Sequence, residues 1–101
     1  MPELRSGMGG RWEVRTRSST HIWDLDAMTY IRVPGPDSTA MPYDEREVPF
    51  TRVEAWPAVG RRTLLFFDDP YDFTTEHWRI CSRIRSITRL PSTPAAEAGT
   101  A

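Results

Sequence analysis

Arginine is the residue type in this sequence with the clearest capacity to bind a charged ligand. Two segments, residues 11–17 and 79–89, carry arginines at alternating positions. Alternate residues of an extended strand point to the same face, and a guanidinium group binds phosphate oxygens through two parallel N–H bonds. If the first and last strands pair, as closure of a barrel requires, one surface gathers Arg11, Arg15, Arg17, Arg79, Arg83, Arg85 and Arg89.

This arginine surface has two interpretations. All 13 basic residues are arginine, against 14 acidic residues, so no strong overall attraction to nucleic acid or membrane is expected. A local basic patch could still bind the phosphates of a nucleic acid, since most acidic residues lie in the expected links between strands. The alternative is a solvated face whose charges discourage edge-to-edge association. The solvated face is favoured because it offers no aromatic side chain to stack on bases.

Carboxylates cluster late in the chain, next to a histidine. Asp68, Asp69, Asp72 and Glu76 supply oxygen ligands of the kind that Ca²⁺ or Mg²⁺ prefers, and His77 follows them. Their spacing lacks the glycine and the alternation of an EF-hand loop. A solvated connection between strands is therefore the preferred interpretation, and neither a metal nor another cofactor is expected.

The two histidines and the single cysteine are the remaining candidates for acid–base or nucleophilic chemistry. His21 and His77 could act together, but no spacing fixes the distance between them. Cys81 is predicted to be a half-exposed small residue of a strand. The sequence has no nucleophile elbow, zinc-protease motif, Cys-x-x-Cys pair or glycine-rich phosphate loop. Catalysis is therefore not expected.

Aromatic side chains are abundant for a chain of 101 residues. The tryptophans are Trp12, Trp23, Trp56 and Trp78. Most should be buried, because large aromatic side chains give a small domain much of its buried area. One or two are predicted to stay outside the core and to join Tyr43, Tyr71 and Phe73 in a contact surface. The primary prediction is therefore a non-catalytic module that binds another protein or a second copy of itself.

Strands must position these residues, because apolar and polar side chains alternate with a period of two. Residues 12–16, 20–25 and 29–33 predict a three-stranded meander, with polar turns at 18–19 and 26–28. The expected inner residues are Trp12, Val14, Thr16, His21, Trp23, Leu25, Thr29, Ile31 and Val33.

Three further strands are predicted at residues 48–56, 63–67 and 77–90. The alternation of the first slips near Thr51-Arg52, which indicates a β-bulge. The second is apolar on both faces, as in a central strand covered twice or a strand with one face at an interface. In the third, the even positions from Trp78 to Leu90 are expected to face inward, with a bend or break near Ser82.

These patterns predict an all-β fold: a small antiparallel meander that closes into a partly open barrel of the SH3 or OB kind, with about six strands. One domain is expected over residues 11–90. Residues 1–10 and 91–101 are expected to be flexible tails, because their composition buries too little surface to offset the ordering entropy. No signal peptide or membrane span is recognisable, so a cytoplasmic location is expected.

Four short patterns carry a resemblance to a known group. They are Trp12-x-Val14-x-Thr16-x-Ser18, Asp24-Leu25-Asp26-x-x-Thr29-x-x-Arg32, Arg52-Val53-Glu54 and Val59-Gly60-Arg61, followed by a closing strand of alternating hydroxyl and aliphatic residues. Over roughly residues 11–90 the sequence resembles a group of short uncharacterised all-β proteins of actinobacteria and their phages. The resemblance implies an all-β fold and a GC-rich source, and the group has no established activity to carry over. Met28 stands where such turns often have glycine.

Overall fold

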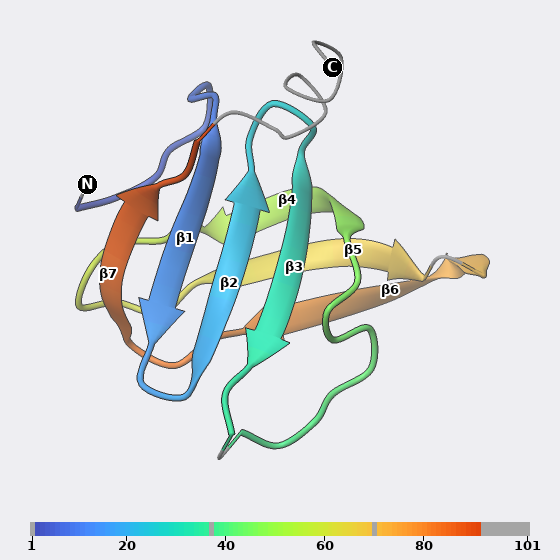
Figure 1. The fold of residues 1–101 in the computed structure, drawn as a ribbon. Coiled ribbons are helices and arrows are strands. Elements are labelled where there is room, and N and C mark those ends of the chain that lie inside the picture. Colours follow the sequence, from blue (N-terminus) through green and yellow to red (C-terminus); the bar gives the residue numbers. More distant parts are fainter. Residues whose placement is uncertain (1, 37, 70, 92–101) are drawn as a thin grey trace, which may run out of the picture.

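In the part of the chain that the structure describes, the strands form a single seven-stranded antiparallel sheet that does not close on itself. The computed structural model describes residues 2–36, 38–69 and 71–91, and the side chain of Phe73 lies outside the described part. The strands are β1 (Arg11–Thr16), β2 (Ser19–Asp24), β3 (Thr29–Pro34), β4 (Val48–Ala55), β5 (Leu64–Asp69), β6 (Asp72–Ile80) and β7 (Ile84–Arg89). Their order in the sheet is β6-β5-β4-β3-β2-β1-β7 (Figure 1). The predicted all-β class is confirmed, and the open sheet is compatible with a small, partly open barrel.

The sheet bends into two layers, with the core between them. Strands β7, β1, β2 and β3 form the front layer of Figure 1, and β4, β5 and β6 cross behind it. Only two residue pairs, Thr29↔Pro49 and Tyr30↔Val48, join β3 to β4, so this short junction is the corner of the bend. Trp23 is fully buried and its ring contacts those of Tyr30, Phe50 and Trp56.

The first and last strands pair, as barrel closure led us to expect. β1 lies antiparallel to β7, from Trp12↔Arg89 to Thr16↔Ile84. The register shifts once, between Arg15 and Thr16, where β7 has one extra residue. Such a bulge bends the strand and re-aims the extra side chain.

The inner face of β3 is the opposite of the predicted one. The turn before it, in which the Asp24 carboxylate accepts hydrogen bonds from two backbone N–H groups, sets the register Trp23↔Tyr30. Directly opposite residues point to the same side of a sheet, so Tyr30 lies in the core beside Trp23. Ile31 and Val33, predicted to face inward with Thr29, are therefore half-buried on the outer face.

The N-terminal segment departs from the loose tail expected from its composition. Leu4 is fully buried in the core, and its backbone N–H donates to the Pro57 carbonyl at 2.8 Å. Val59 in turn donates to Pro2 at 2.8 Å. One aliphatic side chain and a short backbone pairing are thus enough to dock a segment that has no hydrophobic period. Residues 92–101, expected to be a flexible tail, lie outside the described residues.

The expected last strand is two strands, which raises the count from six to seven. β6 ends at Ile80 and β7 begins at Ile84, so the predicted break near Ser82 is confirmed. The expected acidic loop is mostly part of β5 and β6, which form a hairpin that extends past the front layer (Figure 1). In β4, the predicted bulge is confirmed by a register shift between Phe50 and Arg52.

The side chains of β6 face the opposite way from the prediction. Trp78 and Ile80 were expected inside, but they are 58% and 52% exposed. Arg79 and Cys81 are buried instead. The reason is the pairing with β5, which sets Trp78 opposite Phe66 and Arg79 opposite the fully buried Leu65.

Candidate functional site

The outward side of the β5–β6 hairpin carries a continuous row of apolar side chains. The register sets Leu64 opposite Ile80 and Phe66 opposite Trp78, so the four residues share one face. We call this set the outer apolar face. Leu64 and Phe66 are half-buried, whereas Trp78 and Ile80 are more than half exposed. Because β6 is the last strand in the sheet order, the face reaches one end of the sheet.

Charged side chains border the outer apolar face. The Arg52 guanidinium lies 3.9 Å from the centre of the Phe66 ring, in a cation–π contact. Its nitrogens lie 3.2 Å from Glu54 and 3.7 Å from Glu76. All three charged side chains are exposed. An apolar centre with a charged rim is the usual composition of a protein–protein contact.

The inner side of the same hairpin packs against the core and so fixes the position of the outer apolar face. Leu65 and Phe67 are buried in the core. Arg79 lies below them, with its guanidinium 5.3 Å from the Phe67 ring centre and bonded to the Pro42 carbonyl. Arg79 is therefore an internal residue, and its predicted place on the arginine surface is wrong.

The three aromatic residues proposed as partner anchors have different environments. Tyr71 is 78% exposed, and its hydroxyl accepts a hydrogen bond from Arg46 at 3.3 Å. Tyr43 packs edge-on against Phe67 at the border of the core. The third residue, Phe73, has a side chain outside the described part. Of the two whose side chains are described, only Tyr71 is mostly exposed.

Asp69 is committed to internal hydrogen bonds. It accepts from His77 at 2.9 Å, from the Tyr71 N–H at 2.8 Å and from the Tyr43 hydroxyl at 2.8 Å. These bonds, with that of His77 first, lower the pKa of Asp69 to about 2. No group of three or more His, Cys, Asp or Glu side chains in the described ranges could hold a metal ion.

Arg32 anchors the link between β3 and β4 through hydrogen bonds. Its guanidinium donates to both carboxylate oxygens of Asp44, at 2.8 and 2.7 Å, and to the Thr39 carbonyl at 3.2 Å. The Arg32 carbonyl accepts from the Glu45 N–H at 2.7 Å. Tyr43, which lies in this link, was expected to join the contact surface. In the structure, Asp44 and the Thr39 carbonyl of this link bind Arg32, which fixes the backbone conformation of the link.

His21 forms a buried polar chain that no sequence pattern indicated. Its Nε2 lies 2.8 Å from the Ser19 hydroxyl, and its Nδ1 lies 2.6 Å from the Tyr30 hydroxyl. Burial, followed by the charge of Arg32, lowers the pKa of His21 to about 4, so the ring is neutral at pH 7.

This arrangement brings a serine and a base together, but with little room for a substrate. The adjoining cavity measures about 70 Å³, well below the roughly 300–1,000 Å³ of small-molecule sites. Cys81 lines the same cavity and is buried rather than half-exposed, and burial raises the pKa of its thiol. The chain of hydrogen bonds satisfies buried polar groups and orders the core.

The seven arginines of the predicted surface do not form one continuous surface in the structure. Arg11 lies 3.9 Å from Asp24, and Arg15 lies 3.0 Å from Glu13. Arg89 faces the same side as Trp12 and lies over its ring. Arg79 is in the other layer. The three that remain, Arg17, Arg83 and Arg85, adjoin the Thr16↔Ile84 pair at one end of β1 and β7.

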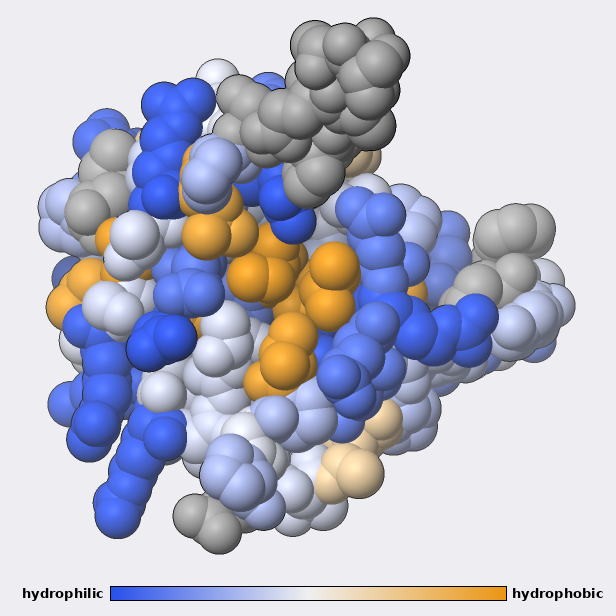
Figure 2. Space-filling model, in the orientation of Figure 1, coloured by the Kyte–Doolittle hydropathy of each residue, from blue (hydrophilic) through white to orange (hydrophobic). Residues whose placement is uncertain are grey.

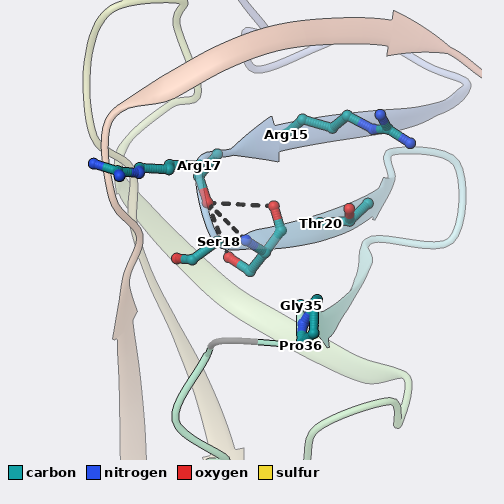
Figure 3. A pocket seen from close by; sticks show the side chains of 8 residues that line it. Arg15, Arg17, Ser18, Thr20, Gly35 and Pro36 are labelled. Carbon is teal, nitrogen blue, oxygen red and sulfur yellow. Dashed lines mark hydrogen bonds between the residues drawn. The ribbon is translucent and has the colours of Figure 1, made fainter.

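A hollow of about 490 Å³ lies beside the turn between β1 and β2. Gly35 forms one wall, and a Cβ at this position would collide with the Ser18 carbonyl oxygen. Figure 3 shows the side chains of Arg15 and Arg17 pointing to opposite sides of the hairpin. Two guanidinium groups that diverge do not form a binding site for one anion in this hollow.

The front layer has a second apolar area. Figure 2 shows apolar atoms at the centre of this face, surrounded by hydrophilic ones. The register sets Ile22 opposite Ile31 on the outer side, with Val33 next along β3. All three are half-buried, so this area exposes less of each side chain than the outer apolar face does of Trp78.

Comparison of the chain with protein-family models, curated proteins and solved structures gave no match. The assignment of function therefore rests on the geometry of these surfaces. Sequence reasoning missed Trp78 and Ile80 as outward residues, although the two-sided apolar strand that became β5 indicated an interface. It also missed the backbone contact between β7 and the segment around Gly60, because no sequence pattern indicates that contact.

Proposed function

We propose that this protein is a non-catalytic interaction module that binds another protein chain through the outer apolar face. The observation that carries the proposal is the paired exposure of Trp78 and Ile80 beside Phe66 on the end strand of the sheet. Covering such side chains contributes about 1–2 kcal/mol each. A cytoplasmic location belongs to the same proposal.

A second copy of the chain is the first partner to test. β6 pairs with β5 on one edge, and no described strand pairs with its other edge. An end strand can pair antiparallel with its own copy across a twofold axis. That arrangement would place the Asp72 end of one β6 near the Ile80 end of the other and would join the two outer apolar faces.

The test is sedimentation of the wild-type chain at concentrations up to about 100 µM, a range that detects micromolar association. We expect a dimer that the Trp78→Ser/Ile80→Ser variant loses. Met41→Ser is the matched control, because it removes an exposed apolar side chain outside the outer apolar face. Circular dichroism checks that all three chains are folded.

A monomeric wild type would exclude the second copy as the partner. In that case the three chains serve as baits, and a protein that the wild type and Met41→Ser retain but Trp78→Ser/Ile80→Ser loses supports the proposed function. If the double variant retains every partner and the same oligomeric state, the proposed function is wrong.

A further inference from the structure

Five exposed arginines gather around the start of β7. Thr16 lies opposite Ile84, which places Arg17 beside Arg83 and Arg85. On the other edge of β7, Gly60 N–H donates to the Ile84 carbonyl and Ile84 N–H donates to the Arg61 carbonyl, both at 2.8 Å. These bonds bring a second arginine pair to the same place. The arginine cluster consists of Arg17, Arg61, Arg62, Arg83 and Arg85.

These five guanidinium groups differ from all the others in the chain. Within the described residues, none of them forms an ion pair, a side-chain hydrogen bond or a contact with an aromatic ring. Every other arginine has a carboxylate, hydroxyl, carbonyl or aromatic ring as its partner. The unpaired positive charge of a nearly neutral protein is therefore concentrated at one end of its sheet.

The local structure directs the cluster outward. Ile84 is 2% exposed and points into the core, so its neighbours Arg83 and Arg85 point to solvent. Arg85 is the extra residue of the β-bulge between β1 and β7. Figure 2 shows hydrophilic side chains projecting at the lower ends of these two strands.

The adjoining carboxylates do not neutralise the cluster. Glu13 lies on β1, and its carboxylate binds Arg15 at 3.0 Å. Glu3, whose backbone pairs with Ala58, has its carboxylate 3.8 Å from Arg5. Glu13 and Glu3 thus each have a cation of their own.

We propose that the arginine cluster binds the phosphodiester backbone of a nucleic acid. Guanidinium groups suit phosphate oxygens, and several unpaired groups on one open surface suit a chain of phosphates better than a single anion. All five residues are exposed, and Arg17 alone among them lines the hollow of about 490 Å³, so that hollow does not gather the cluster around one small ligand. Contacts to phosphates carry no information about the bases, so this binding is independent of base sequence.

Fluorescence anisotropy with labelled duplex DNA, single-stranded DNA and RNA of about 20 nucleotides tests this proposal. With about four or five phosphate contacts, raising the salt from about 50 to 200 mM weakens binding by about a hundredfold or more. The Arg83→Ser/Arg85→Ser variant removes two contacts, so it should bind more weakly at low salt and show a salt slope smaller by about 2. The three probes decide between DNA and RNA as the source of the backbone.

The control variant is Arg46→Ser/Arg89→Ser, which removes the same charge from exposed residues outside the cluster. It should retain the wild-type salt slope. The proposal is overturned if no probe binds at low salt, or if both double variants weaken binding equally. Equal or tighter binding to vesicles of anionic lipid, measured by co-sedimentation, would assign the cluster to a membrane surface instead.

Discussion

The two ends of the sheet expose opposite chemistries. At the β6 end, Trp78 and Ile80 present apolar surface, and the nearby Arg52 is paired with glutamates. At the β7 end, the apolar residue Ile84 is buried, and the arginines around it have no partner among the described side chains. In each strand the residues alternate between two faces. The register with the neighbouring strand decides which set of alternate residues faces the core, and this causes the difference between the two ends. One bend in one sheet thus separates an apolar surface from a positively charged one.

The largest expected difference between the two ends concerns two isoleucines four positions apart. Ile84→Ala should lower the free energy of unfolding by about 2–4 kcal/mol, because it leaves a cavity in the core. Ile80→Ala removes a half-exposed side chain and should cost less than about 1 kcal/mol. Urea denaturation of both variants measures the contrast. Similar losses for the two would mean that both ends are packed alike.

Acid should act on the two layers at different pH. His21, on β2, has a folded-state pKa of about 4, below its ordinary value of 6.5. Protonation therefore favours unfolding, and about 3 kcal/mol of stability, fully present above pH 6.5, is lost as the pH falls to 4. Asp69, at the β6 end, contributes stability above pH 3.8 that is lost as the pH falls towards 2.

Urea denaturation between pH 7 and 4 measures the His21 contribution, through the free energy of unfolding of the wild type, His21→Gln and His77→Gln. The loss of stability between pH 6.5 and 4 should disappear in His21→Gln and remain in His77→Gln. A loss of equal size in all three chains would contradict the assignment to His21.

The smallest expected effect lies at the turn near the corner that joins the two layers. Met28 has a φ of 59°, in the left-handed region, and is 46% exposed. Met28→Gly should raise the free energy of unfolding by up to about 1 kcal/mol, because glycine adopts this conformation without steric strain. Thermal unfolding measures the gain. The variant should leave the proposed binding at the outer apolar face and at the arginine cluster unchanged. Altered binding at either surface would show that the corner couples the two ends.

The sequence predicts the strands better than their faces. Alternation located the strands of the meander, the bulge in β4 and the break after Ile80, because each depends on local pattern. It failed for Tyr30 and Trp78, whose direction is set by turn length and by the partner strand. A tyrosine and an aliphatic residue that alternate give no clue to which one faces inward until the register is known.

The candidate surfaces were predictable only in part. The two-sided apolar pattern of residues 63–67 indicated an interface, and Arg17, Arg83 and Arg85 were recognised as residues at one end of a strand pair. Arg61 and Arg62 were not, because two backbone hydrogen bonds across more than 20 residues bring them to Ile84. Contacts of this kind have no sequence period.

The backbone pairing of Gly60 and Arg61 with Ile84 also bears on how many copies the proposed assembly could contain. It occupies the free edge of β7 at its first residue, where the unpaired arginines repel a like-charged copy. If strands add at β6 alone, as in the proposed dimer, each chain offers one edge for pairing. Self-assembly of the proposed kind would then end at a pair of chains instead of growing into a fibre.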